Sequence, residues 1–392
     1  MRQETRAYGG MAPEVIQVVA YLSAKGEYGG PTSVALDQVR ELNSIGRATT
    51  LLAGWDGMAK VGTEPGVVHL FRARLALRGR IASLHSTPLL GALLLVPSRA
   101  VAHVHFGRDL IALPAALVLA ARGIPLVLQP HGMVRPDPRR AVRLLDALLT
   151  RPLLRRSAAV IVLTEQERTD ILAVAGQRVR TVLVTNGVAV DRTAASVSRA
   201  SQEARPIEVV FIARLHPRKQ VMVFAEVAAA LLDEGMDLRC RIAGPDAGDL
   251  TRLQEFIRAH PRFASRLRYV GPVTREGARE LLRSADVYVL PSVGEVYPVT
   301  ALEAMAEGAA LVITSDCPLA AELAHSGSAI VTEPDVEHMA AAVRRLVSDA
   351  ALRRATAERA LQEVKGRYSI SFVARRLIEI YEQAGVGDPR SR

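Results

Sequence analysis

The sequence predicts an α/β protein built from two doubly wound, parallel-sheet domains in succession. Short apolar segments rich in β-branched residues alternate with longer helical patterns along almost the whole chain, which is typical of parallel βα units. At 392 residues the chain is longer than a single hydrophobic core usually supports. A polar, aperiodic stretch rich in Ala and Ser, residues 190–206, separates the two halves and is expected to be a linker.

The alternation places the elements in order. In the first half we expect strands near residues 15–21, 47–53, 67–71, 101–105, 125–129, 159–163 and 181–184. In the second half we expect strands near residues 208–213, 238–243, 267–270, 286–290, 310–314 and 329–332. Helices are expected between them, for example over residues 32–44, 220–234, 276–284 and 337–348.

The predicted domains are residues 1–188 and residues 207–369, joined by a linker at residues 189–206. A last helix, within residues 370–392, is expected to pack back on the first domain. Ligands of doubly wound sheets bind outside the carboxyl ends of the strands. We therefore expect two facing Rossmann-like domains with an interdomain cleft between those strand ends.

The composition narrows the cellular setting. Cys240 and Cys317 are too few for a disulfide framework, which favours a reducing, cytoplasmic compartment. Residues 1–14 lack the apolar stretch of a secretory signal, and the longest uncharged apolar runs fall short of the roughly 20 residues that a spanning helix needs. Residues 1–188 hold 23 Lys and Arg against 13 Asp and Glu, so the net charge of +10 lies entirely in this half. Such a basic surface attracts phosphates on nucleic acid, lipid or substrate.

The stretch AKGEYGGPTSVALDQVREL, residues 24–42, is a glycine-rich turn between the first strand and the first helix. Gly29 and Gly30 let backbone N–H groups approach an anion, and the N-terminus of the following helix adds a favourable dipole. The turn is neither G-x-G-x-x-G nor a P-loop, which disfavours dinucleotide and P-loop functions. Alone, a double glycine is more often just a tight turn.

Two further stretches place polar side chains at the ends of strands. Arg214 and Lys219, in VVFIARLHPRKQ, suit a diphosphate, although alone they would be interpreted as solvated loop charges. His131, in PLVLQPHGM, also follows a strand and is followed by a glycine. We expect the neighbouring His103 and His105 to be structural.

The stretch GEVYPVTALEAMAEGA, residues 294–309, follows an apolar strand and contains two carboxylates. Glu295 is expected in the loop after the strand, and Glu303 about one turn into the next helix, beside backbone N–H groups that suit a phosphate. Because a carboxylate accepts hydrogen bonds from two hydroxyls, the pair would hold two polyol groups that flank a diphosphate. Taken alone, they would be interpreted as ordinary surface glutamates.

Together and in this order, these stretches resemble the retaining GT-B glycosyltransferases of glycosyltransferase family 4. The resemblance extends over nearly the whole chain and includes NGV at 186–188 and VGPV at 270–273; the Glu-x7-Glu motif is its most specific part. It implies an α/β, GT-B fold. It also implies transfer of a sugar from a nucleoside-diphosphate sugar to an acceptor hydroxyl, with retention of the anomeric configuration.

The resemblance also implies individual roles. His131 and Glu295 would be the catalytic residues beside the transferred sugar, and Glu303 would bind the ribose hydroxyls of the donor. The other donor-binding residues that it implies, around the diphosphate and the base, are Gly29, Gly30, Arg214, Lys219, Val273, Val299 and Thr300.

The sequence departs from the family pattern at three places. Ala213 and Gln220 stand where the family usually has glycine, and Glu-Val-Tyr-Pro at 295–298 replaces Glu-Gly-Phe-Gly. Proline removes a backbone N–H group there, which bears on the identity of the donor more than on activity. No Asp-x-Asp occurs in the sequence, which disfavours a metal-dependent GT-A enzyme, so we expect neither a metal nor a cofactor.

The expected partners are a nucleotide-sugar donor and a sugar or lipid-linked acceptor, with no nucleic acid. QPHGM favours cell-surface polysaccharide or glycolipid biosynthesis, at the inner face of the cell membrane. Basic, leucine-rich stretches at residues 72–99 and 139–156 would dock on anionic lipid, or equally would be core leucines beside solvated arginines. Transfer to a soluble natural product is an alternative, as is an inactive sugar-nucleotide-binding subunit. A nucleotide-sugar epimerase and an NAD-dependent oxidoreductase are disfavoured.

Overall fold

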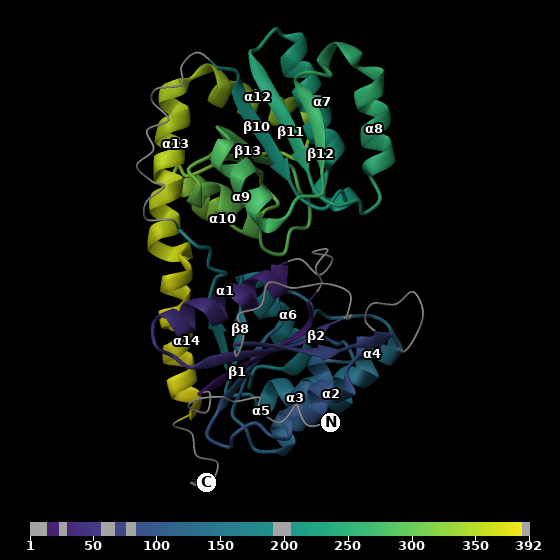
Figure 1. Cartoon of the computed structure of the whole chain (residues 1–392), viewed down its shortest axis with the longest axis vertical. Coiled ribbons are helices and arrows are strands. Elements are labelled where there is room, and N and C mark those ends of the chain that lie inside the picture. The colour runs from purple at the N-terminus through teal and green to yellow at the C-terminus, as the bar shows by residue number, and fades with distance from the viewer. Residues whose placement is uncertain (1–13, 23–29, 56–66, 76–83, 191–204, 386–392) are drawn as a thin grey trace. The chain divides into compact units, whose positions relative to one another are not determined.

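A computed structural model describes residues 14–22, 30–55, 67–75, 84–190 and 205–385 (Figure 1). The chain forms two compact units, Met1–Gly187 with Ile370–Arg392, and Val188–Ser369. Most of the predicted linker at 189–206 lies outside the described residues. No helix within these ranges is long and apolar enough to cross a membrane.

The first unit contains a seven-stranded sheet in which every strand pairs in parallel with its neighbours. Its strands are, in spatial order, β3 (Val68–Arg72), β2 (Thr49–Trp55), β1 (Val15–Leu22), β6 (Val101–His105), β7 (Leu126–Gln129), β8 (Ala159–Val162) and β9 (Thr181–Leu183). A separate antiparallel pair, β4 (Arg74–Leu75) with β5 (Leu84–His85), was not expected from the sequence.

Helices cover both faces of the first sheet. Because strand residues alternate between faces, Ile16 and Val18 pack towards one set of helices while Val15 and Val19 pack towards the other. The first set is α2 (Thr87–Leu93), α3 (Ala112–Ala121), α5 (Arg151–Arg156) and α6 (Glu165–Ala175), with α4 (Arg140–Leu145) and the π-helical η2 (Asp146–Thr150) leading into α5. The second set is α1 (Gly30–Ser44) and α14 (Ile370–Gly385), the last helix of the chain.

The second unit contains a six-stranded parallel sheet. Its strands are, in spatial order, β12 (Leu267–Gly271), β11 (Leu238–Ala243), β10 (Ile207–Ile212), β13 (Val287–Leu290), β14 (Ala310–Thr314) and β15 (Ile330–Thr332). The helices on one face are α7 (Val221–Asp233), α8 (Leu250–Ala259) and α12 (Val336–Ser348). Those on the other face are α9 (Arg275–Ser284), α10 (Val299–Ala306) and α13 (Ala350–Glu363).

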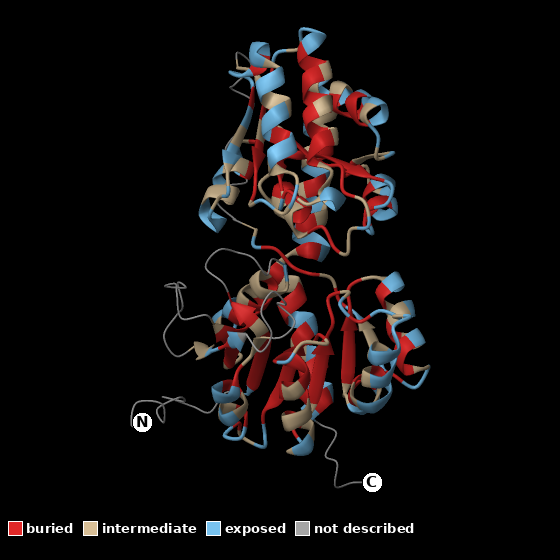
Figure 2. Ribbon diagram, turned by 90° about the vertical axis from the view of Figure 1, so that its right-hand side faces the viewer, coloured by how far each residue is buried: buried red, intermediate tan, exposed pale blue. Residues whose placement is uncertain are grey.

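Short elements complete the second unit: the 3₁₀ turns η5 (Pro217–Lys219) and η6 (Pro261–Phe263), the helix α11 (Ala320–His325), and the π-helical η7 (Val364–Tyr368). In both units the buried residues concentrate on the strands and on the helix faces that cover them (Figure 2). The thirteen strands expected from the sequence are all present, with ends within two residues of the expected ones.

Both sheets have the strand order of a doubly wound fold. In each, the first strand of the unit lies in the middle, and the chain builds outward first to one side and then to the other. The order reverses between β1 and β6 in the first unit and between β10 and β13 in the second. The loops that follow these strands are where such folds bind ligands.

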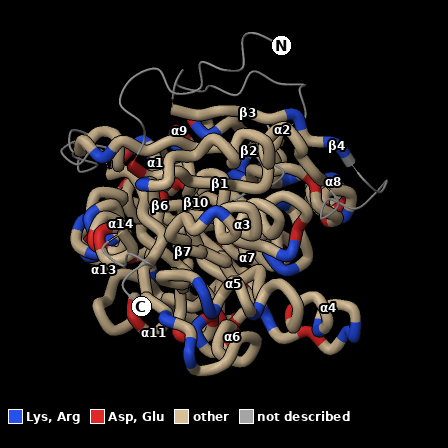
Figure 3. The backbone as a smooth tube through the Cα atoms, turned by 90° about the horizontal axis from the view of Figure 1, so that it is seen from below, with Lys and Arg blue, Asp and Glu red and all other residues tan. Residues whose placement is uncertain are grey.

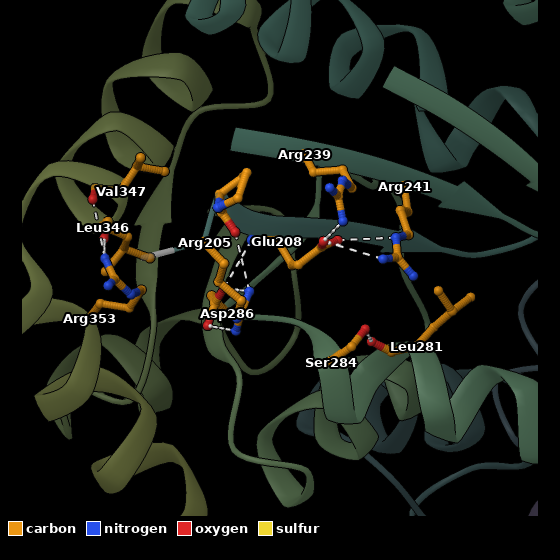
Figure 4. Close-up of polar contacts among 11 residues, drawn as sticks. Arg205, Glu208, Arg239, Arg241, Leu281, Ser284, Asp286, Leu346, Val347 and Arg353 are labelled. Carbon is orange, nitrogen blue, oxygen red and sulfur yellow. Dashed lines mark hydrogen bonds and ion pairs between the residues drawn. The ribbon is translucent and has the colours of Figure 1, made fainter. Parts of the chain in front are cut away.

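The opposite, amino end of the second sheet is held by ion pairs (Figure 4). Arg205 makes two hydrogen bonds to Asp286, at 2.8 and 2.9 Å, and the Asp286 carboxylate also accepts the backbone N–H of Glu208. The buried Glu208 carboxylate in turn pairs with Arg239 and Arg241 of β11. These contacts fix the start of β10 against β11 and β13, away from the loops at the carboxyl ends.

Candidate functional site

In the second unit, the loops that follow β10 and β13 meet at the point where the strand order reverses. Lys219, in the loop after β10, forms an ion pair with Glu295, in the loop after β13. Both side chains are largely buried. The two loops are also joined through the backbone, since Val293 N–H donates to Arg218 C=O at 2.8 Å and Arg218 Nη1 donates to Gly294 C=O at 3.3 Å. The structure thus brings together two residues that the sequence separates by 76 positions.

The loop that carries Lys219 is strained. Gln220 follows it with φ of +51°, a left-handed conformation that side-chain-bearing residues rarely adopt. Within the described ranges the only other non-glycine residue with positive φ is His131. Strained backbone conformations persist where the surroundings enforce them and are concentrated at functional sites. Both strained residues therefore mark loops that the sequence predicts to be functional.

Helix α10 begins where the sequence predicts, and Glu303 lies about one turn into it, half-buried. Some of the N–H groups in the first turn of α10 have hydrogen-bond acceptors. Val299 N–H donates to Tyr297 C=O at 3.1 Å, and the N–H groups of Ala301 and Leu302 both donate to Pro298 C=O. The N–H of Thr300 has no backbone acceptor among the described residues. Val299 and Thr300 are the two donor-binding residues expected at this helix start, and Thr300 is thus the one whose backbone N–H is available to an anion.

Tyr288, which the sequence predicts only as part of a buried strand, organises this site. Tyr288, in β13, is fully buried and donates its hydroxyl hydrogen to Ile212 C=O, at the end of β10, at 3.0 Å. Thr300 also hydrogen-bonds to the Tyr288 hydroxyl, and burial, followed by the negative charges of Glu303 and Glu295, raises the pKa of that phenol. Tyr288 therefore stays neutral and ties the strand before Arg214 to the start of α10. A tyrosine hydroxyl in an apolar strand was the available signal, because it needs a partner.

Arg214 and Val273 lie at the same edge of this sheet. Arg214 is exposed in the loop after β10, and no described residue forms an ion pair with it. The backbone just before Arg214 packs closely against Gly244, in the loop after β11. Gly244 has φ of +143°, and a Cβ added to it would lie 1.8 Å from the carbonyl oxygen of Ala213, so the position of Arg214 depends on this glycine. Val273 is half-buried in the loop after β12. These are the residues that the sequence predicts around a diphosphate and a base.

In the first unit, Gly30 is the exposed first residue of α1, and a Cβ there would meet no atom within 4 Å. The start of α1 is tied to the end of β1 because Thr32 Oγ1 donates to Tyr21 C=O at 3.0 Å. Gly29 lies outside the described residues.

His131 is buried in the loop that follows β7, and both His131 and Gly132 have positive φ. Glu167, at the start of α6, holds this turn: its carboxylate accepts the backbone N–H of Gly132 and, at 2.7 Å, that of Leu163. Burial raises the pKa of Glu167. Glu167 is not identifiable from the sequence, because only the fold brings α6 beside the loop.

His105 was expected to be structural, yet it contacts His131 directly, with 2.7 Å between His105 Nδ1 and His131 Nε2. Burial lowers the pKa of His131 to about 3, with a further contribution from His103. His131 is therefore neutral at physiological pH. Within the described residues no group of His, Cys, Asp and Glu could hold a metal ion.

Two family models match the chain. "Glycosyl transferase 4-like domain" matches residues 29–187, and "Glycosyl transferases group 1" matches residues 206–349. The chain belongs to the group 1, family 4-type glycosyltransferases. D-inositol 3-phosphate glycosyltransferase of Corynebacterium urealyticum is 29% identical over 57% of this chain and 56% of its own. Phosphatidyl-myo-inositol mannosyltransferase of Mycobacterium tuberculosis is 31% identical over 53% of this chain and 55% of its own. The chain thus spans about half the length of these curated relatives.

Solved structures share the fold. A glycosyltransferase from Rickettsia africae has a TM-score of 0.73 and 14% sequence identity, with 97% of this chain and 100% of that chain covered. HepE of Anabaena, solved in complex with UDP, has a TM-score of 0.70 and 17% sequence identity, with 94% of this chain and 99% of that chain covered. With the two Rossmann-like units, this similarity confirms the predicted two-domain GT-B fold.

The structure explains departures from the family pattern. Gln220, where the family usually has glycine, takes the left-handed conformation that glycine adopts without strain. Ala213 packs against the core of its unit. Pro298 precedes α10 and supplies the carbonyl that accepts from Ala301 and Leu302, so the proline removes one donor without disrupting the helix start.

Proposed function

We propose that the protein transfers a sugar from a nucleoside-diphosphate sugar to an acceptor hydroxyl, with retention of the anomeric configuration. Arg214 and Lys219 neutralise the diphosphate, and Glu303 accepts hydrogen bonds from the ribose hydroxyls. The observation that carries the proposal is the Lys219–Glu295 pair at the switch point of the second sheet, with Glu303 on the adjoining helix. HepE, a protein of the same fold, was solved with UDP.

The ion pair indicates how the donor is engaged. In the structure the Lys219 ammonium is paired with Glu295. A diphosphate carries more negative charge than one carboxylate, so it replaces Glu295 as the partner of Lys219. The Glu295 carboxylate then accepts hydrogen bonds from hydroxyls of the transferred sugar. From the family resemblance we further assign Gly30 to phosphate binding, Val273 to the base and His131 to the sugar.

Charge on the leaving group is stabilised by cations and a backbone donor. As the bond between the anomeric carbon and the diphosphate breaks, negative charge grows on the diphosphate, and Arg214, Lys219 and the Thr300 N–H stabilise it. We propose that the acceptor hydroxyl attacks the anomeric carbon on the face from which the diphosphate leaves, through an oxocarbenium-like state, and that its proton passes to an oxygen of the departing diphosphate. Because these groups supply the positive charge, we expect activity that is unchanged by EDTA.

The test begins with thermal shift against UDP-, GDP-, ADP- and dTDP-sugars, since a ligand that binds only the native state raises the apparent stability. With the donor identified, slow release of nucleoside diphosphate without acceptor is measured. Lys219→Ala should abolish the release, whereas Lys365→Ala, an exposed lysine of η7, should leave it unchanged. Stabilisation without release or transfer would instead support an inactive sugar-nucleotide-binding subunit. Neither stabilisation nor release with any donor contradicts the proposal.

We further propose that the acceptor is lipid-linked and that α4 and η2 dock on anionic lipid, in cell-surface polysaccharide or glycolipid biosynthesis. Leu144 and Leu148 are 61% and 64% exposed one turn apart, beside the exposed Arg140 and Arg143. Figure 3 marks the Lys and Arg positions of the chain around α4 in blue and the Asp and Glu positions in red. Apolar and basic residues on one helix face are typical of interfacial docking. The other candidate stretch, residues 72–99, is mixed: Leu89 and Leu93 are core residues, whereas Leu94 and Leu95 are 59% and 63% exposed. Residues 76–83 of this stretch lie outside the described residues.

Co-sedimentation with vesicles of anionic lipid, at low and high salt, tests the docking. The wild-type protein should bind at low salt and dissociate at high salt, because exposed charges are screened. The double variant Leu144→Glu/Leu148→Glu should not bind, whereas Leu183→Glu, at an exposed leucine of β9, should bind like the wild type. Binding that does not change with salt or with the double variant contradicts the docking. Transfer to a soluble acceptor by a protein that binds no vesicles would favour a natural-product acceptor.

A further inference from the structure

The face of the first sheet that α1 and α14 cover is mostly apolar, but it contains a group of polar side chains that water does not reach. All six are at most 1% exposed. They are Gln17 of β1, Gln38 of α1, His103 and His105 of β6, Gln129 of β7 and Tyr381 of α14. Burying polar groups is unfavourable unless they are hydrogen-bonded to one another, so such a group requires a connected network.

The hydrogen bonds form a continuous line that ends at His131. Tyr381 Oη lies 2.7 Å from His103 Nδ1 and accepts from Gln17 Nε2 at 3.2 Å. Gln17 Oε1 lies 3.1 Å from His105 Nε2. His105 Nδ1 lies 2.7 Å from His131 Nε2, with the two rings stacked at a centroid separation of 5.0 Å.

This line determines which nitrogen of each ring carries a proton. Burial lowers the pKa of His105 and His131 well below neutrality, so each ring has a single N–H. An amide oxygen only accepts, so His105 donates from Nε2 to Gln17 Oε1 and its Nδ1 carries the lone pair. His131 therefore donates from Nε2 to that lone pair, and its own Nδ1 is an acceptor. No described residue hydrogen-bonds to His131 Nδ1.

We propose that His105, oriented by Gln17, is a positioning residue that fixes His131 as the Nε2–H tautomer and so makes His131 Nδ1 an acceptor for a hydroxyl of the bound sugar. The lone pair of His131 Nδ1 can accept a hydrogen bond from a hydroxyl group. It cannot bind an ionised phosphate oxygen, because that oxygen is itself only an acceptor. His131 therefore recognises the sugar part of the substrate. The identity of the substrate rests on the proposed function, whereas the tautomer does not.

Two variants of His105 separate positioning from packing. His105→Phe keeps a ring of similar size but removes the acceptor, so His131 is no longer confined to one tautomer. His105→Gln supplies an amide oxygen that accepts from His131 Nε2–H. We expect roughly a tenfold lower kcat for His105→Phe, with the donor KM within about twofold, and recovery of most of the loss in His105→Gln. His103→Phe, a matched ring substitution of the same network without contact to His131, should keep kcat within about threefold.

Nitrogen NMR of the full chain labelled with ¹⁵N-histidine tests the tautomer directly, with His131→Asn used to assign the signal. The wild-type protein and His105→Gln should show His131 protonated at Nε2, and His105→Phe should show a mixture of tautomers. Wild-type His131 protonated at Nδ1, or an unchanged tautomer and kcat in His105→Phe, overturns the proposal. If no donor is turned over, the tautomer in the wild type and in His105→Gln still decides it, and the lack of turnover counts only against the proposed function.

Discussion

Acidification should destabilise the first unit, because its core holds three histidines in the neutral form. Burial lowers the pKa of His103 and His131 to about 3, and that of His105 well below its ordinary value. In the unfolded chain each of these imidazoles has a pKa near 6.5. As pH falls through 6.5, the unfolded chain gains protons that the native protein does not bind. The contribution of the three neutral histidines to the unfolding free energy is therefore complete well above pH 6.5. It is lost progressively as pH falls through this value.

The size of the effect follows from the shifts. Between pH 7.5 and 5.5, one such histidine lowers the unfolding free energy by about 1.4 kcal/mol, so the three together lower it by about 4 kcal/mol. Native proteins have unfolding free energies of about 5–15 kcal/mol, so this loss is large. Asp109 and Glu167, whose pKa values are raised by burial, act in the opposite direction at lower pH. The difference between the wild type and a histidine variant removes their contribution.

Urea unfolding at pH 7.5 and 5.5 is the assay, followed through the fluorescence of Trp55, the single tryptophan, in β2 of the first unit. His103→Gln should reduce the loss between the two pH values by about one third, to about 2.7 kcal/mol. His325→Gln changes an exposed histidine of α11, outside the buried histidine group. Its unfolding free energy should fall between the two pH values by as much as that of the wild type. An unfolding free energy that is equal at the two pH values in the wild type would refute the reasoning.

Two further substitutions test the loops of the second unit. Gln220→Gly should raise the unfolding free energy, measured by urea unfolding, by up to about 1 kcal/mol. Glycine relieves the left-handed strain, and this gain exceeds its entropic cost. A loss of stability would mean that the Gln220 side chain has a role of its own. Gly244→Ala should lower the unfolding free energy by about 3 kcal/mol or more and should weaken nucleoside-diphosphate binding, because the new Cβ would displace the backbone before Arg214. Unchanged stability and binding would show that the close approach of Gly244 to Ala213 does not position the loop.

The fold was largely predictable, because in parallel βα units the local pattern and the global topology agree. Apolar segments such as Val287–Leu290 and Ala310–Thr314 are buried on both faces and are distinct in the sequence from the amphipathic helices between them. The short β4–β5 pair was not predicted, since two-residue strands leave no periodic signal. The loops with Lys219 and Glu295 were predicted to share a sheet edge, and the structure joins them by an ion pair.

The polar contacts behind the candidate residues could not be predicted. His105 alternates with apolar residues in a buried strand, so the sequence alone indicates a core position and gives no partner. Glu167 has the spacing of an N-terminal helix residue, and only the fold shows that its carboxylate holds Gly132. Tyr381 lies 364 residues from Gln17, to which it is hydrogen-bonded. Such contacts depend on tertiary packing and not on local pattern.

The roles of the two glutamates are the most direct test of donor binding and transfer, and calorimetry with the nucleoside diphosphate alone separates them. Glu303→Ala should weaken binding by roughly ten- to a hundredfold, the effect of losing one or two charge-assisted hydrogen bonds to the ribose. Glu295→Ala should bind the nucleoside diphosphate as tightly as the wild type or more tightly, because the carboxylate that competes for Lys219 is removed. Its turnover of the whole sugar nucleotide should fall by roughly ten- to a hundredfold. Equal loss of affinity in both variants would contradict the assignment of ribose and sugar, and unchanged affinity and turnover in both would contradict the glycosyltransferase site itself.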